Sequence, residues 1–345
     1  MAEDLEKLAV IYSKAARFDE ARNTFQRALD IYERHGAEGE SQAARVSQLM
    51  GNVLQMQGLF SEAEISYKKA IALLEHFAGR QDFRTASALR SLGWLYLTSG
   101  RVSDAYEALT KALRVADKVL PEDSPEFIVF LDSQGALLCE LSRFAEAERM
   151  WLRALRIAET ACRDDASRYV FVLHHLGQLY SSIGKYKSAE GVLKRTLLIY
   201  GRDNELSSMA RAVTMSELGN VYTRLKRYEE AAPLFQSSLQ IVNAQRDLVP
   251  FSSAHVLTLA GNYYMSRHEW ETAEQCYRHA LKLREATLGD RPAVAVTLTS
   301  LAQALLRLHR KKEAKDYQAR ADQIVAAQDP AFRGHTIDVR AFNAN

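Results

Sequence analysis

The chain has 345 residues, 47% of them hydrophobic, and 45 Lys and Arg against 43 Asp and Glu give a formal net charge of +2. This composition supports a large folded core, and the near-neutral charge disfavours a general electrostatic grip on nucleic acid or on membrane phosphates. With only 6 Pro and 16 Gly, the scarcity of helix breakers favours an all-helical protein.

The cysteines and the hydropathy of the chain favour a cytoplasmic protein without membrane insertion. Three widely spaced cysteines form no disulfide framework and no metal-binding spacing. The first residues are charged and acidic, unlike a signal peptide. The longest run without Asp, Glu, Lys or Arg, residues 248–266, contains a proline and several polar residues, which a transmembrane helix would not carry.

A repeat of 42 residues organises the chain. Glycines recur at this spacing, and we call them the glycine ladder: Gly51, Gly93, Gly135, Gly177, Gly219 and Gly261. Alanine stands twelve residues after each ladder position, and a large side chain stands three residues after it. Such self-similarity indicates a repeat architecture in which each unit packs on its neighbours.

Each repeat has the pattern of two helices, because apolar residues recur at steps of three and four and the breaks between them are short and polar. The third repeat predicts helices over 86–97 and 102–119, joined by a tight turn in which Gly100 adopts positive φ. Small residues on the ladder have a steric reason, since a bulky side chain would hold the paired helices apart.

The motif resembles the tetratricopeptide repeat, as in Leu218-Gly219-Asn220-Val221-Tyr222 followed by Tyr228-Glu229-Glu230-Ala231. The 42-residue period is similar to the kinesin-light-chain variety of that family, and the connector at residues 288–295 is its best match. The resemblance implies an all-α fold, a right-handed α-solenoid of about eight helix-turn-helix repeats. It predicts a superhelix over 1–327, with repeats near 1–41, 42–83, 84–125, 126–167, 168–209, 210–251, 252–293 and 294–327.

The two ends of the chain depart from the repeat. Ala9 and Gln303 replace the ladder glycine in the first and last units, as expected of terminal repeats. The basic residues of 307–315 fit either a solvated end-cap or a patch for an acidic partner. Residues 328–345 lose the helical pattern and predict an extended or mobile tail, which either stays loose or docks on this molecule or another and supports self-association.

The sequence contains no catalytic motif of recognised spacing, so we expect a non-enzymatic protein without a cofactor or metal. His174 and His175 are adjacent and would point about 100° apart on a helix, which suits one metal ion poorly. First-turn acids such as Glu20, Glu62, Glu146 and Glu230 fit helix N-termini better than catalysis.

Polar residues recur on the first helix of each repeat and predict a binding groove. In the geometry of the family, first helices line the concave side, so residues three before and one after the ladder share a stripe. Asn and Gln carry donors and acceptors that pair with a peptide main chain, and an exposed Trp supplies an anchor. The predicted groove residues are Gln48, Asn52, Arg90, Trp94, Asp132, His174, Gln178, Ser216, Asn220, Thr258 and Asn262.

Two hypotheses follow for the function. The first is a scaffold that holds a peptide or protein segment in the concave groove. The second is a regulator whose superhelix changes shape when a signalling peptide binds. The alternative for the stripe is a set of solvated polar positions without a partner.

Overall fold

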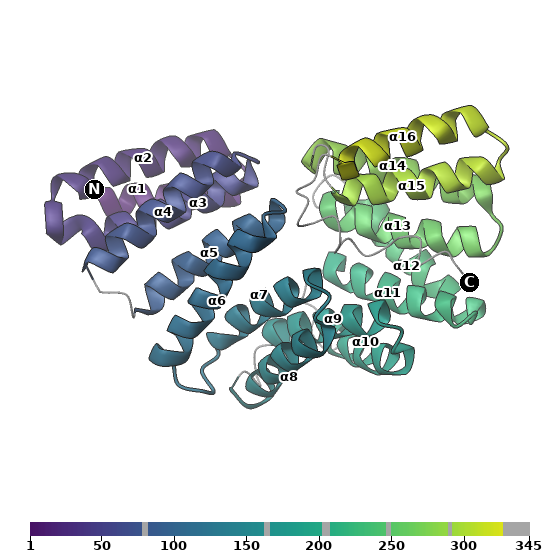
Figure 1. The fold of residues 1–345 in the computed structure, drawn as a ribbon, viewed down its shortest axis with the longest axis horizontal. Helices are drawn as coiled ribbons and strands as arrows, with labels where there is room; N and C mark the ends of the chain where they lie inside the picture. The colour runs from purple at the N-terminus through teal and green to yellow at the C-terminus, as the bar shows by residue number, and fades with distance from the viewer. Residues whose placement is uncertain (78–81, 162–165, 202–207, 246–249, 289–291, 327–345) are drawn as a thin grey trace. The chain divides into compact units, whose positions relative to one another are not determined.

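The computed structural model describes residues 1–77, 82–161, 166–201, 208–245, 250–288 and 292–326 (Figure 1). This part of the chain is all-α, without strands, which confirms the predicted fold class. The predicted tail, 328–345, lies outside the described residues. Contacts divide the chain into unit 1, residues 1–161, and unit 2, residues 162–345, and each is described by itself.

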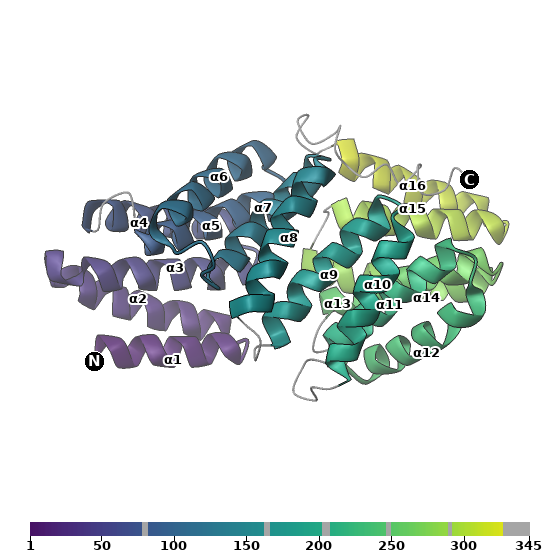
Figure 2. The same ribbon diagram turned by 90° about the horizontal axis from the view of Figure 1, so that it is seen from below.

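Unit 1 contains four helix pairs in chain order, and Figure 2 shows α1, α2 and α3 lying side by side. Its helices are α1 (Ala2–Lys14), α2 (Phe18–Arg34), the short 3-10 helix η1 (Gly36–Gly39), α3 (Glu40–Met56), α4 (Phe60–Phe77), α5 (Phe83–Thr98), α6 (Val102–Val119), α7 (Phe127–Glu140) and α8 (Phe144–Ala161). Each second helix of a pair also packs on the first helix of the next pair.

Unit 2 repeats the same arrangement in its described residues. Its helices are α9 (Ala166–Ser182), α10 (Tyr186–Tyr200), α11 (Ser208–Arg224), α12 (Tyr228–Gln245), α13 (Pro250–Ser266), α14 (Trp270–Leu288), α15 (Pro292–Arg307) and α16 (Lys311–Ala326). Pro233 lies inside α12, where the repeat predicts a continuous helix despite the lost hydrogen bond.

The glycine ladder brings the two helices of each pair into close contact. A Cβ atom at any of its six glycines would lie 2.5–2.9 Å from a side-chain atom of the second helix. The residue it would meet is large in every pair: Tyr67, Leu109, Trp151, Leu193, Phe235 and Tyr277. All six of these residues are buried. This confirms the steric reason predicted for glycine, because only a missing side chain leaves room for the packed ring or leucine.

The turns inside the helix pairs share one backbone conformation. Gly58, Gly100 and Gly184 have φ between +76° and +81°, which confirms the prediction for Gly100. The corresponding residues of the other five turns are also left-handed although they are not glycine: Ala16, Ser142, Lys226, His268 and His309. In the third repeat the Arg101 amide donates to the Tyr96 carbonyl at 2.8 Å, a bond that closes the end of a helix.

An arginine after this turn forms an ionic bracket between consecutive second helices. Arg101 pairs with Glu64 of the preceding repeat at 2.5 Å and with Asp104 of its own helix at 2.6 Å. Its guanidinium also lies 4.2 Å from the centre of the Tyr96 ring. Arg227 repeats the arrangement with Glu190 in unit 2. Of the first-turn acids, Asp104 pairs with Arg101, and Glu146 and Glu230 pair in the same way with Arg143 and Arg227.

Candidate functional site

The first helices of the pairs carry all the predicted groove residues. In unit 1 these helices are α1, α3, α5 and α7, where α5 contacts both α3 and α7. In unit 2 they are α9, α11, α13 and α15, which contact one another in succession. We call the polar stripe that the sequence predicts on these helices the first-helix face of each unit. The structure places the predicted residues on it in three different environments.

In unit 1 the first-helix face presents exposed polar and aromatic groups. Asn52 on α3 is exposed, and Trp94 on α5 has 37% of its surface accessible. The Asn52 side-chain oxygen accepts a hydrogen bond from the Tyr67 hydroxyl at 2.7 Å, which fixes the orientation of the amide. Among the described residues the Asn52 amide nitrogen makes no hydrogen bond, so both of its N–H groups are free to donate.

Arg90 lies one helical turn before Trp94 and is half-buried. Its Nε is shielded from solvent and has no hydrogen-bond acceptor. Burial lowers the pKa of the Arg90 guanidinium, while the negative charge of Asp132 acts in the opposite direction. A guanidinium remains charged in this environment, so Arg90 brings an unsatisfied cation to this face.

Asp132 belongs to the interior of its helix pair. Its side chain is 5% exposed and accepts a hydrogen bond from the Trp151 indole nitrogen at 2.9 Å. This bond holds α8 against α7 at the point where Gly135 contacts the same ring. The Asp132 carboxylate therefore provides the hydrogen-bond acceptor for the buried Trp151 indole, a role that the sequence did not predict.

In unit 2 two predicted residues are buried and bonded to their own helices. Ser216 has no exposed surface and donates to the Val213 carbonyl at 2.7 Å. Thr258 is 8% exposed and donates to the Ala254 carbonyl at 2.8 Å. Their hydroxyls are satisfied internally, as is common for Ser and Thr in helices. Asn220 and Asn262 remain half-buried, and the Asn262 oxygen accepts from the Tyr277 hydroxyl at 2.7 Å.

A buried carboxylate joins three first helices of unit 2. Glu217 on α11 is 5% exposed and lies 2.6 Å from the His255 ring nitrogen on α13. Gln178 on α9 donates to the same carboxylate oxygen at 3.1 Å. Burial acts to raise the pKa of Glu217, but His255, the nearby His174 and the Gln178 hydrogen bond together lower it below its usual value.

Glu217 was not among the predicted site residues, although the sequence contains a signal for it. The position two residues before the ladder glycine holds leucine, serine or histidine in the other repeats: Leu49, Ser91, Ser133, His175 and Leu259. A carboxylate at this position is therefore an exception to the repeat. Gln178 and His174 were predicted to face a partner. In the structure Gln178 donates a hydrogen bond to Glu217, and the charge of His174 helps to lower the pKa of that carboxyl group.

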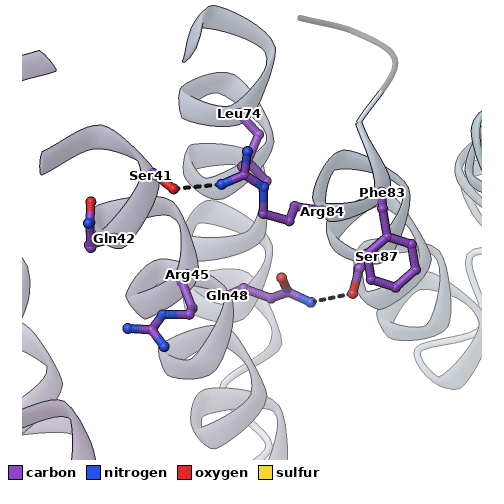
Figure 3. A pocket seen from close by; sticks show the side chains of 8 residues that line it. All are labelled: Ser41, Gln42, Arg45, Gln48, Leu74, Phe83, Arg84 and Ser87. Carbon is purple, nitrogen blue, oxygen red and sulfur yellow. Dashed lines mark hydrogen bonds between the residues drawn. The ribbon is translucent and has the colours of Figure 1, made fainter. Parts of the chain in front are cut away.

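Unit 1 also contains a pocket of about 280 Å³ between α3, α4 and α5 (Figure 3). One predicted residue, Gln48, contributes to its wall and donates to Ser87 at 3.2 Å. The buried side-chain oxygen of Gln42 has no hydrogen-bond partner. The lining combines polar and apolar side chains: Ser41, Gln42, Arg45, Gln48, Leu74, Phe83, Arg84 and Ser87. Its size suits one side chain of a bound chain.

Neither of the two described cysteines carries the chemistry of a nucleophile. Burial raises the pKa of the Cys139 thiol to about 12 and that of Cys276 to about 11, so both stay protonated near neutral pH. Within the described ranges, no group of three or more His, Cys, Asp or Glu residues is arranged to hold a metal ion. None of the described helices has the length and apolar character needed to cross a membrane.

Comparison with known families gives matches along most of the chain. A tetratricopeptide repeat model matches residues 42–118, 129–202 and 252–323. A second tetratricopeptide repeat model matches residues 5–35 and 211–243. Comparison with curated proteins gives no match.

Several solved structures are similar to this chain. The apo form of the quorum sensor NprR from B. thuringiensis has a TM-score of 0.69 and 14% identity, covering 94% of this chain and 87% of its own. A Rap protein complexed with competence and sporulation factor has a TM-score of 0.66 and 16% identity, covering 88% and 79%. TPR-like repeats from Podosopora anserina, assigned to a kinesin light chain, have a TM-score of 0.51 and 19% identity, covering 60% and 98%. At these identities the likeness concerns the fold.

Proposed function

Because the chain belongs to the tetratricopeptide repeat family, we propose that it is a non-enzymatic scaffold that binds a peptide or protein segment along its first-helix face. In this proposal residues 1–327 act as the repeat array, and the bound segment contacts Asn52, Arg90 and Trp94 in unit 1. Asn220 and Asn262 provide contacts of the same kind for a segment bound to unit 2. The array needs no cofactor, because binding uses main-chain pairing and side-chain anchors.

The observation that carries the proposal is the state of the polar groups on the first-helix face of unit 1. The Asn52 amide donates no hydrogen bond within the described structure, and Trp94 exposes an aromatic surface close to Arg90. Exposed tryptophan and arginine are the residue types that dominate protein interfaces. Free amide donors complement the carbonyl groups of an extended chain.

The structural neighbours support the same class of function. A Rap protein of similar fold was solved in complex with competence and sporulation factor, and NprR is a quorum sensor. The repeat fold is thus used elsewhere to receive a second molecule.

The test is a selection of random displayed peptides on the immobilised full chain. We expect the wild type to enrich a set of peptides and Trp94→Ala to weaken their binding about tenfold, in line with the loss of an aromatic anchor. The matched control is Ile65→Ala, because Ile65 lies on the second helix α4 and is 67% exposed. Enrichment of no peptides, or equal weakening by both variants, would contradict the proposal.

Asn220→Ala provides the corresponding variant in unit 2. It is a cleaner choice than Asn262→Ala, since loss of the Asn262 oxygen would also leave the buried Tyr277 hydroxyl without its acceptor. We expect a smaller loss of peptide binding than for Trp94→Ala, because an amide contributes one or two hydrogen bonds and little apolar surface.

A further inference from the structure

The side chain three residues before the ladder position links consecutive first helices in unit 1. Glu6 on α1 is buried and accepts a hydrogen bond from the Arg45 guanidinium on α3 at 2.7 Å. One repeat later, Gln48 on α3 donates to Ser87 at 3.2 Å and to Ser91 at 3.1 Å, both on α5. In two successive repeats this position therefore finds its polar partner on the next first helix.

Arg90 occupies the same position on α5 and lacks that partner. The residues of α7 that correspond to Ser87 and Ser91 are Val129, which has no polar side chain, and Ser133, which donates to the Val129 carbonyl at 2.8 Å. Asp132, the carboxylate that acts on Arg90, accepts from the Trp151 indole. Within the described residues Arg90 forms no hydrogen bond and no ion pair, and its Nε is buried without an acceptor.

A half-buried guanidinium without an acceptor is costly, since each shielded N–H loses its bond to water and gains nothing in return. The two terminal nitrogens of Arg90 are not among the buried atoms without a partner, so a ligand acceptor reaches the guanidinium through them. The five donors of a guanidinium match the two oxygens of a carboxylate. The nearby negative charge of Asp132 reduces the positive potential at Arg90, which favours a singly charged carboxylate over a doubly charged phosphate.

Two exposed side chains of the first-helix face offer further contacts for a bound chain. Trp94 follows Arg90 by one helical turn on α5, so the two side chains share a face. On α3 the exposed Asn52 provides a second contact, and the hydroxyl of the buried Tyr67 fixes its side chain by a hydrogen bond of 2.7 Å.

We propose that Arg90 binds the side-chain carboxylate of an Asp or Glu in the bound segment, with an apolar neighbour of that residue resting on Trp94. This inference rests on the proposed function and specifies its partner as an acidic segment with adjoining apolar residues. It concerns unit 1 alone.

The experiment uses random peptides fixed at both ends in a displayed scaffold, so that no free terminal carboxylate is present, and the immobilised full chain as bait. We expect the wild type to enrich Asp and Glu next to apolar residues. Replacement of the enriched acid by Gln or Asn in a synthetic, end-capped peptide should weaken binding about tenfold. Arg90→Gln should weaken the parent peptide by a similar factor and should not weaken the neutral peptide further.

The matched control is again Ile65→Ala, which should leave both peptides unchanged, and circular dichroism checks that Arg90→Gln remains helical. Peptides enriched without acidic residues, or independent losses from the two changes, would overturn this inference and leave the proposed function standing. Acidic preference only in a library with free C-termini would overturn the side-chain assignment. If the wild type enriches no peptides at all, the proposed function and this inference both fail.

Discussion

The polar residues of the first-helix face have different environments in the two units. In unit 1 the first-helix face keeps groups that are exposed or without a partner, namely Asn52, Trp94 and Arg90. In unit 2 the corresponding region is joined internally by the Glu217 cluster, and the hydroxyls of Ser216 and Thr258 are bonded to their own helices. In unit 2 the polar groups link neighbouring repeats, whereas in unit 1 the unbonded groups are the ones that we propose contact a ligand.

The largest expected change in the free energy of unfolding comes from replacing a bonded group of unit 2 by alanine, and an unbonded group of unit 1 is its comparison. Glu217→Ala should lower the free energy of unfolding by about 3 kcal/mol, because His255 and Gln178 lose a shared buried partner. Arg90→Ala should change it by less than about 1 kcal/mol, since no bond is lost. Urea unfolding of the full chain, followed by circular dichroism, measures both. Equal losses would remove the distinction between the units.

The glycine ladder should be equally intolerant in both units. Gly135→Ala and Gly261→Ala should each lower the free energy of unfolding by about 1–3 kcal/mol, because the new methyl would lie 2.5–2.7 Å from a buried ring. The matched control is Gly191→Ala in α10, where no atom lies within 4 Å; it should raise the free energy of unfolding by about 0.5–1 kcal/mol. Thermal unfolding of the three variants would show whether the signs differ as expected.

The ionic brackets should make the stability of both units depend on pH in the same direction. Burial acts to raise the pKa of Glu64, but hydrogen bonds from Lys68, Tyr96 and Arg101 outweigh it and lower the pKa to about 2. In unit 2, hydrogen bonding by Lys194 is the largest cause that lowers the pKa of Glu190. Both carboxylates therefore stabilise the folded state fully above their ordinary pKa of 4.5, and this contribution is lost as the pH falls through the lowered pKa of each, which is about 2 for Glu64.

Glu64→Gln and Glu190→Gln test this dependence. Each should lower the free energy of unfolding by about 1–2 kcal/mol at pH 7, and the difference from wild type should shrink as the pH falls below 4.5, vanishing near pH 2 for Glu64→Gln. Urea titrations between these two pH values provide the measurement. A constant difference across the range would show that the brackets contribute through packing and not through charge.

The smallest expected effect concerns the turns. Lys226 in unit 2 has a φ of 58°, whereas Gly100 in unit 1 takes the same conformation without a steric penalty. Lys226→Gly should therefore raise the free energy of unfolding by up to about 1 kcal/mol. Lys226→Ala is the control, because it removes the charge and keeps the strained backbone; a gain of the same size from both would contradict the explanation.

Most of the fold could be predicted from the sequence, and less of the site. The glycine ladder predicted the helix pairs correctly. Each pair needs a residue without a side chain where a large residue of the second helix packs, as at Gly135 and Trp151, so glycine recurs once in each repeat. The turn residues other than glycine were not predicted, since Lys226 and Ala16 carry no preference for positive φ and are held there by the helices around them. The conformational preference of a single residue does not include this constraint from the flanking helices.

Polarity alone could not separate the three environments of the first-helix face. Ser216 and Thr258 look like groove residues in the sequence, but a hydroxyl is easily satisfied by the carbonyl one turn earlier in its own helix. Glu217 escaped attention because its partners, Gln178 and His255, lie 39 and 38 residues away and meet it only after the helices stack. Sequence periodicity predicts which helices adjoin, whereas the pairing of individual side chains depends on the assembled face.

The ionic brackets are unevenly distributed in the array, and this has a mechanical consequence. At the junction between α12 and α14 the positions of Glu64 and Arg101 are held by Ala232 and Glu269, and at the junction between α2 and α4 by Arg22 and Leu59, so the attractive pair forms at neither. Under an applied stretching force, neighbouring repeats separate first where the fewest interactions hold them together. We therefore expect the extension of a single tethered molecule to begin at these two junctions, before the bracketed junctions yield.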